Sequence, residues 1–189
     1  MVILLVKAKE FAGHAHREHV RSDEAKTPYV FHLEEVAELV RASGGSDEEI
    51  AAAWLHDSVE DTEATIEDIY KEFGKEVGDI VEGVTDLLEW LPLPLEERKA
   101  KQAERVAKES SSIRRVKLAD QTSNVRICGL GNDAFTMEVK FIYIDGAKNI
   151  AEACKGVSPY LDALFAEHYE AAYKNLTVLR AQLSEENGG

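Results

Sequence analysis

The sequence has few residues that cross-link a small protein or interrupt its helices. Its two cysteines, Cys128 and Cys154, are too few and too far apart for a CxxC metal site or a disulfide framework. We expect both to be reduced core residues. Only four prolines and twelve glycines occur among 189 residues, which excludes a collagen-like or low-complexity chain and favours regular helices.

Long apolar runs and an excess of positive charge are also missing. The apolar opening from Val2 to Val6 is too short for a signal-peptide core or a membrane span, so we expect no membrane association and a cytoplasmic location. Twenty-two basic against thirty-six acidic residues give a net charge of −14, which opposes binding to nucleic acid. An anionic ligand therefore needs a local cluster of cations or a metal ion.

What the sequence does contain is apolar residues at helical spacing in nearly every segment, and no run alternates as a strand would. The predicted fold class is all-α, an orthogonal helical bundle of about eight or nine helices. We expect one domain over residues 1–183 and a frayed tail at 184–189. The expected helices cover roughly residues 2–19, 28–42, 46–63, 65–73, 77–88, 96–108, 113–128, 135–154 and 159–183.

One apolar helical run, from Ala51 to Leu55, leads directly into the ionisable side chains His56, Asp57, Glu60 and Asp61. On a helix, spacings of three and four residues put these groups on adjacent faces. Burying unpaired ionisable groups costs several kcal/mol, and a bound metal ion would remove that cost. One side of this turn can therefore hold a cation, and the rest of it can hold a water.

Two further residues complete a candidate ligand set. His32 lies among apolar neighbours on an earlier helix, and Asp120 lies on the apolar face of a later one. Taken singly, each also fits an ordinary buried group that is satisfied by hydrogen bonds. Together with His56 and Asp57 they offer two imidazoles and two carboxylates, a mixed set that suits Mn²⁺, Fe²⁺ or Zn²⁺ and leaves positions for water and substrate.

These candidates are part of a longer ordered set of motifs. The set contains Phe11-Ala12, His16-x-x-His19-x-Arg21, Thr27-Pro28-Tyr29-Val30-x-His32, Ala52-x-x-Leu55-His56-Asp57-x-x-Glu60-Asp61-Thr62, Phe73-Gly74, Gly83-Val84-Thr85, Glu97-Arg98-Lys99 and Val116-Lys117-Leu118-Ala119-Asp120-x-x-x-Asn124-x-Arg126. In this order the motifs resemble those of the HD-domain metal phosphohydrolases. Within that family they resemble the RelA/SpoT group and the stand-alone small alarmone hydrolases, which include the metazoan SpoT homologue.

The resemblance implies an HD-domain helical bundle and a hydrolase of nucleotide alarmones, the signals of the stringent response. It implies that His32, His56, Asp57 and Asp120 bind one Mn²⁺ per chain, with Fe²⁺ or Zn²⁺ possible in its place. The implied reaction is hydrolysis of the 3′-diphosphate of (p)ppGpp or (p)ppApp. Pyrophosphate is released and the 5′-phosphorylated nucleoside remains.

The same resemblance assigns the attacking water to Glu60 and Asp61, and substrate contacts to Arg21 and Asn124. The chemistry is consistent, because a dication acidifies water and a carboxylate one turn away can take its proton. Cations near the site would neutralise the remaining phosphate charge. The candidates for that role are Arg21, Lys26, Arg98 and Lys99.

Three residues depart from the family pattern: His19, Leu33 and Gln121 stand where Gln, Pro and a basic residue are usual. The choice between a guanosine and an adenosine alarmone therefore stays open. Two other functions also stay open, an HD-type nucleotidase acting on 5′-monophosphates and a module that binds an alarmone without turnover. The expected partner is a small nucleotide. A homodimer through the aromatic last helix is possible, although core packing explains the same residues.

Overall fold

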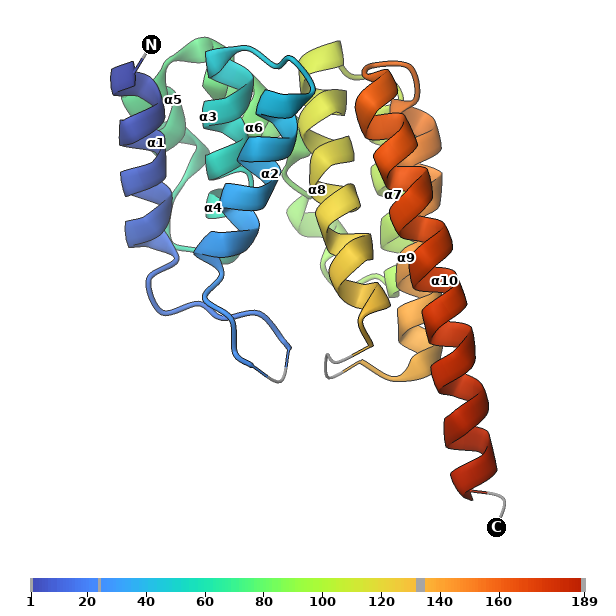
Figure 1. Cartoon of the computed structure of the whole chain (residues 1–189). Coiled ribbons are helices and arrows are strands. Elements are labelled where there is room, and N and C mark those ends of the chain that lie inside the picture. Colours follow the sequence, from blue (N-terminus) through green and yellow to red (C-terminus); the bar gives the residue numbers. More distant parts are fainter. Residues whose placement is uncertain (1, 24, 132–134, 188–189) are drawn as a thin grey trace.

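A computed structural model of the chain describes residues 2–23, 25–131 and 135–187 (Figure 1). These residues form ten α-helices and one 3-10 turn, and an isolated bridge between Val20 and Pro28 is the nearest thing to a strand among them. The predicted all-α class is confirmed. No helix in the described part of the chain has both the length and the apolar character needed to cross a membrane.

The helices form a bundle in which α8 runs through the middle (Figure 1). In chain order the elements are α1 Val2–Ala15, α2 Val30–Ala42, α3 Asp47–Leu55, α4 Ser58–Asp61, α5 Ile66–Phe73, α6 Lys75–Val84, the 3-10 turn η1 Leu88–Trp90, α7 Leu95–Val106, α8 Ser111–Gly129, α9 Met137–Cys154 and α10 Pro159–Asn187. Helix α8 packs against α2, α3 and α6 on one side and against α9 and α10 on the other. It therefore joins the two halves of the bundle.

The sequence patterns Ser46-x-x-Glu49 and Thr65-x-x-Asp68 predict a capping box at the start of a helix, and both boxes are confirmed. The Ser46 side chain accepts a hydrogen bond from the Glu49 backbone, and the Glu49 carboxylate accepts one from the Ser46 backbone. Thr65 and Asp68 make the same reciprocal pair at the start of α5. Each box satisfies backbone donors that a helix N-terminus leaves free.

Several predicted helix ends are wrong by a few residues, because contacts outside the helix decide where it stops. Helix α1 ends at Ala15 rather than near His19, and the chain then makes loop hydrogen bonds such as Tyr29 N to His19 O. Helix α6 ends at Val84 rather than near Leu88. Helix α10 continues through Asn187, so its helical turns include part of the segment that we expected to fray.

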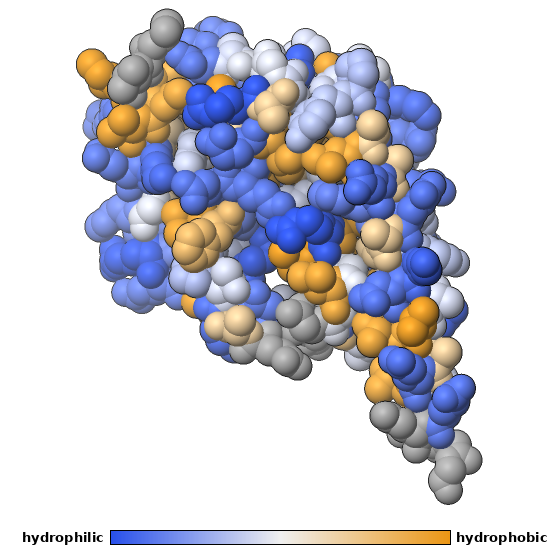
Figure 2. Space-filling view, in the orientation of Figure 1, coloured by the Kyte–Doolittle hydropathy of each residue, from blue (hydrophilic) through white to orange (hydrophobic). Residues whose placement is uncertain are grey.

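The core follows the predicted apolar faces. Trp90 packs onto the body of the protein with 7% of its surface exposed, and both cysteines are buried thiols that form no disulfide. On α10, Leu161 and Leu176 are fully buried in the core, as the core-packing alternative requires. Further along α10, Val178 stays exposed, and Figure 2 shows apolar surface over the projecting end of this helix. A homodimer through α10 remains a prediction.

Candidate functional site

The central stretch does not form one helix as predicted, because the helix breaks at the His-Asp pair. Helix α3 ends at Leu55, His56 keeps helical dihedral angles, and Asp57 has φ −97° and ψ −2° before α4 begins. This sparsely populated conformation is common at active sites. The break brings the Asp57 carboxylate beside the imidazole of the preceding residue.

The four predicted metal ligands meet at one buried point between α2, α3 and α8. The His32 Nε2 atom lies 3.5 Å from Asp57 Oδ2 and 3.5 Å from Asp120 Oδ1. The His56 Nε2 atom lies 2.9 Å from Asp57 Oδ2 and 3.6 Å from Asp120 Oδ1. Both imidazoles are almost fully buried. Ligand atoms of His32, His56 and Asp57 lie within 4.8 Å of one another, which suits a metal ion.

The tautomer of His32 follows from a chain of hydrogen bonds behind it. Ser123 Oγ donates to Glu35 Oε2 at 2.8 Å, so its one hydroxyl proton is used. Its oxygen, 3.0 Å from His32 Nδ1, therefore accepts the imidazole proton. Arg126 holds the Glu35 carboxylate through two hydrogen bonds of 2.8 Å. The lone pair of His32 Nε2 is thus left facing the two carboxylates.

The His56 imidazole has the same orientation for a different reason. Its Nδ1 lies 2.8 Å from the carbonyl oxygen of Ala53, which can only accept, so the proton is on Nδ1. Among the described residues neither imidazole Nε2 atom has a hydrogen-bond partner. A nitrogen lone pair 2.9 Å from a carboxylate oxygen is repelled unless a cation lies between them. The donor set therefore fits a divalent metal ion.

The titration of the cluster agrees with this requirement for a cation. Burial opposes ionisation of Asp57, but the two imidazoles outweigh it and hold the pKa of that carboxyl well below its usual range. Burial also opposes protonation of His56, yet Asp57 and Asp120 raise its pKa well above the usual value. Either a proton or a metal ion can supply the positive charge at this point. The two compete for it.

A pocket of about 300 Å³ opens beside the metal site. Glu60 and Asp61 stand at its wall on α4, and neighbouring protein raises the pKa of Glu60 to about 7, chiefly by desolvation, although part of the side chain reaches solvent. Burial and then the nearby Asp57 also raise the pKa of Asp61. Both predicted water-handling carboxylates thus face the space where a substrate would meet the metal.

The structure separates the predicted cations into two groups. Arg98 and Lys99 line the pocket, whereas Arg21 lies behind its wall and donates at 3.1 Å to Oδ1 of Asn124, which does line it. Lys26 is exposed and does not line the pocket. It stands in the loop before α2 with φ 51°, a left-handed conformation that points to a local turn.

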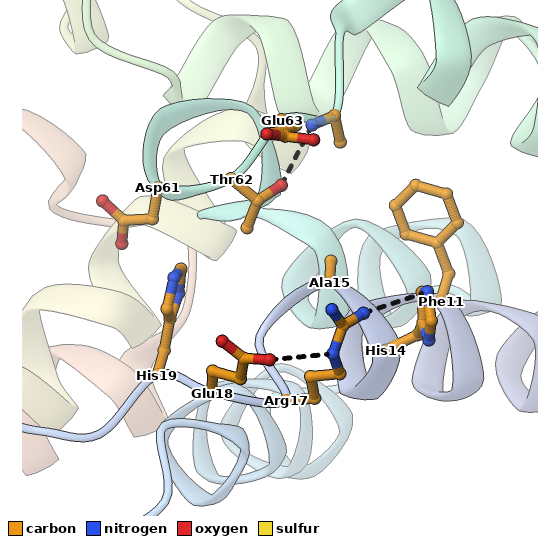
Figure 3. Close-up of a pocket in the computed structure, with 10 residues that line it drawn as sticks. Phe11, His14, Ala15, Arg17, Glu18, His19, Asp61, Thr62 and Glu63 are labelled. Atoms are coloured by element: carbon orange, nitrogen blue, oxygen red, sulfur yellow. Dashed lines mark hydrogen bonds and ion pairs between the residues drawn. The ribbon is translucent and has the colours of Figure 1, made fainter.

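A second pocket, of about 510 Å³, lies on the α1 side of Asp61 (Figure 3). Its wall carries Arg17, Glu18 and His19, and Figure 3 shows the His19 ring pointing toward Asp61 at one side of it. The Nδ1 atom of His19 lies 3.1 Å from His16 Nδ1. Because Asp61 borders both pockets, the water-handling side of the site can be reached from two directions.

Sequence reasoning missed several residues that shape the site. Tyr29 donates to Asp57 Oδ2 at 2.7 Å, and Lys117 lies 3.8 Å from Asp120 Oδ2. Ser123 and Glu35 set the tautomer of His32. The spacing of Lys117 and Ser123, each three residues from Asp120 on a helix, was a usable signal. Nothing in the sequence indicated that Ser123 would bond to Glu35 on α2.

Comparisons with known proteins agree with this site. A family model described as the HD domain matches residues 8–143, a span that includes all four predicted metal ligands. The guanosine-3′,5′-bis(diphosphate) 3′-pyrophosphohydrolase MESH1 of Xenopus tropicalis is 42% identical over 125 residues, which are 65% of this chain and 68% of that protein. The MESH1 protein of Mus musculus is 32% identical over 169 residues, covering 88% of this chain and 93% of its own length.

A solved structure shares the fold. It is described as a metazoan ortholog of SpoT that hydrolyzes ppGpp and plays a role in starvation responses. It superimposes with a TM-score of 0.82 at 32% sequence identity and covers 88% of this chain and 94% of its own. The likeness thus extends well beyond the helices that carry the ligands.

Proposed function

The chain belongs to the HD domain family, and from that premise we propose that it is a metal-dependent alarmone 3′-pyrophosphohydrolase with ppGpp as its substrate. The MESH1 relatives carry this activity in their names, and the similar solved structure is described as hydrolysing ppGpp. The observation that carries the proposal is the pair of buried Nε2 lone pairs facing two carboxylates beside a pocket lined by acids and cations.

The proposed metal ion is Mn²⁺, one per chain. His32, His56, Asp57 and Asp120 would hold it, and two imidazoles with two carboxylates suit Mn²⁺ while also admitting Fe²⁺ or Zn²⁺. When bound, a dication polarises a phosphoryl oxygen and lowers the pKa of a water molecule. The chain supplies the remaining parts of the chemistry.

Glu60 and Asp61 would position the attacking water and receive its proton. The elevated pKa of Glu60, about 7, suits a general base near neutral pH. The Asp86 backbone N–H donates to Glu60 Oε1 at 2.6 Å, which fixes the direction of that carboxylate. One oxygen of Glu60 is thus anchored, and the other is available to the water.

Lys99, Arg98 and Arg21 would neutralise the phosphate charge of the substrate. The Lys99 ammonium is buried in the pocket wall, where a charge interacts more strongly than in water. Arg21, held by Asn124, approaches from the loop after α1. These cations give a strongly acidic protein a local site for an anion.

The proposed reaction consumes one water per turnover. The water oxygen forms a bond to the phosphorus next to the 3′-oxygen of the nucleoside, and the bond between that phosphorus and the 3′-oxygen breaks. The 3′-oxygen takes up a proton, so ppGpp gives the 5′-diphosphate nucleoside and pyrophosphate. No covalent enzyme intermediate is needed.

The retained Glu60 and Asp61 argue against a module that only binds an alarmone, because binding needs no carboxylates directed at a water. The first experiment is anion-exchange chromatography of products after the Mn²⁺-loaded protein is incubated separately with ppGpp and ppApp. We expect pyrophosphate and the 5′-diphosphate nucleoside from ppGpp. Faster turnover of ppApp would change the proposed base.

Controls separate the reaction class from the metal. His56→Ala is expected to lose both bound metal, measured by elemental analysis, and activity. If neither alarmone is cleaved by the wild-type protein, and dAMP or dGMP instead releases orthophosphate, the protein is a 5′-nucleotidase and the present proposal is wrong. Tight alarmone binding without product would identify a sensor.

A further inference from the structure

Gln121 joins the metal site to the cationic wall of the pocket. Its side chain is buried, with 2% of the residue exposed, next to Asp120 on α8. Its Nε2 donates to Asp120 Oδ2 at 2.7 Å, and its Oε1 accepts from Lys99 Nζ at 2.9 Å. The amide can point only this way, because a carboxylate only accepts hydrogen bonds and an ammonium only donates them.

The two carboxylate oxygens of Asp120 make different contacts. Asp120 Oδ1 is the oxygen that faces His32 Nε2 and His56 Nε2, at 3.5 and 3.6 Å. Asp120 Oδ2 is turned away toward Gln121 and, at 3.8 Å, toward Lys117 Nζ. Asp120 Oδ1 also accepts a hydrogen bond from Asn124 Nδ2 at 2.5 Å. Gln121 holds the other oxygen, so the two amides together keep the carboxylate rotated with Oδ1 directed at the metal.

The contact with Lys99 holds an ammonium at the opposite end of the same amide. The aliphatic part of the Lys99 side chain, on α7, lies against Gly146 of α9. A Cβ at position 146 would lie 2.7 Å from both Lys99 Cβ and Lys99 Cγ, so this close approach requires a glycine. Its ammonium lies 4.2 Å from the centroid of the Tyr143 ring. Gln121 gives this buried cation its hydrogen-bond acceptor, so it determines where the positive charge stands.

We propose that Gln121 is a positioning residue that orients the metal ligand Asp120 and holds Lys99 toward the substrate phosphates; the phosphate part rests on the proposed function. A neutral amide is required for this double role. A lysine at position 121 would place a third ammonium beside Lys99 and Lys117. It could donate to Asp120, but it could not accept from Lys99.

The first test measures metal binding alone. Metal-free protein is titrated with Mn²⁺ by calorimetry for the wild type, Gln121→Met, Lys99→Met and Thr122→Val. Gln121→Met keeps the volume but removes both hydrogen bonds, and it is expected to weaken Mn²⁺ affinity about tenfold or more. Lys99→Met should change the affinity less than about threefold.

Thr122→Val is the matched control. Thr122 is the next residue on α8 and is equally buried, and its side-chain hydroxyl donates to Leu118 O of the same helix at 2.7 Å. Circular dichroism verifies that each variant is folded. The proposed role of Gln121 at Asp120 would be overturned if Gln121→Met bound Mn²⁺ with wild-type affinity. It would also be overturned if Thr122→Val lost as much Mn²⁺ affinity as Gln121→Met.

The second test measures the coupling to Lys99 at saturating Mn²⁺. Gln121→Met and Lys99→Met should each raise KM for ppGpp, and the double variant should be no worse than Lys99→Met by more than about twofold. If the two substitutions raised KM by factors that multiplied in the double variant, the coupling between Gln121 and Lys99 would be overturned. Absence of turnover in the wild type would contradict the proposed function instead, and the calorimetric test would still decide the role of Gln121 at the metal.

Discussion

At the residue scale, nearby carboxylates titrate differently because their surroundings differ. Asp57 faces two imidazoles, which hold its pKa well below the usual range. Glu60, three residues later, lacks such a partner, and desolvation raises its pKa to about 7 despite the opposing field of Lys117. Environments that push two pKa values apart assign different tasks to chemically similar groups. Asp57 is suited to bind the cation, and Glu60 to take a proton.

The pH dependence of the reaction tests the task of Glu60. As a base, Glu60 works only when it is deprotonated, so kcat/KM should fall as the pH drops below about 7. A bound dication lowers the pKa of Glu60 and should therefore move this fall in kcat/KM to lower pH. Glu60→Gln should lose about 100- to 10,000-fold in kcat, while the metal content stays at the wild-type level. Stopped assays over pH 5 to 9 provide the measurement.

Metal content at each pH is the control, because protonation of the His ligands also weakens metal binding. If Glu60→Gln kept the wild-type kcat, or if the acid limb persisted unchanged in that variant with metal fully bound, Glu60 would not be the base. Asp61 would then be the remaining candidate.

At the element scale, glycines decide where helices can touch. Helices α7 and α9 pack closely, and Gly146 lies against the Lys99 stem. Gly13, in the interior of α1, has no neighbouring atom within 4 Å of where a Cβ would stand. The same residue type therefore serves packing at one position and contributes only flexibility at the other.

Alanine at these two positions should change stability in opposite directions. Gly146→Ala forces α7 and α9 apart and should lower the free energy of unfolding by about 1–3 kcal/mol. Gly13→Ala should raise it by about 0.4–1 kcal/mol, because alanine restricts the unfolded chain and fits the helix. Urea denaturation followed by circular dichroism measures both, and a Gly146→Ala protein as stable as wild type would contradict the close approach.

At the scale of the whole molecule, the metal site ties together helices that are far apart in the sequence. The proposed ligands come from α2, from the α3–α4 junction and from α8, which itself packs against both halves of the bundle. An ion bound there is lost when any of these helices separates. Metal binding should therefore stabilise the fold as a unit.

Thermal unfolding with and without metal tests this linkage. At a free Mn²⁺ concentration 100 times Kd, binding contributes about 2.7 kcal/mol. For a protein of this size that corresponds to a Tm higher by roughly 5–10 °C than in EDTA. Because a proton competes at His56, whose pKa is raised, the Mn²⁺ affinity and the gain in Tm should grow as the pH rises above 6.5.

Asp120→Ala serves as the control, since it removes a ligand and should show little response to Mn²⁺. A Tm that does not depend on Mn²⁺ in the wild-type protein would argue against a metal site that joins the three helices. An equal rise in Asp120→Ala would mean that Mn²⁺ binds elsewhere.

The sequence by itself determined the helical class, the two capping boxes and the chemical types of the proposed metal ligands. These features depend on neighbours three or four residues away, and such periodicity is visible in the chain.

Tertiary structure decided the rest. The free nitrogen of His32 depends on Ser123, 91 residues away, and Arg21 is held beside the pocket by Asn124, 103 residues away. Lys26 is exposed and stands outside the pocket, and Gln121 meets Lys99 only because α7 packs beside α8. Hydrogen bonds between distant segments form only after the helices pack, so no local pattern encodes them.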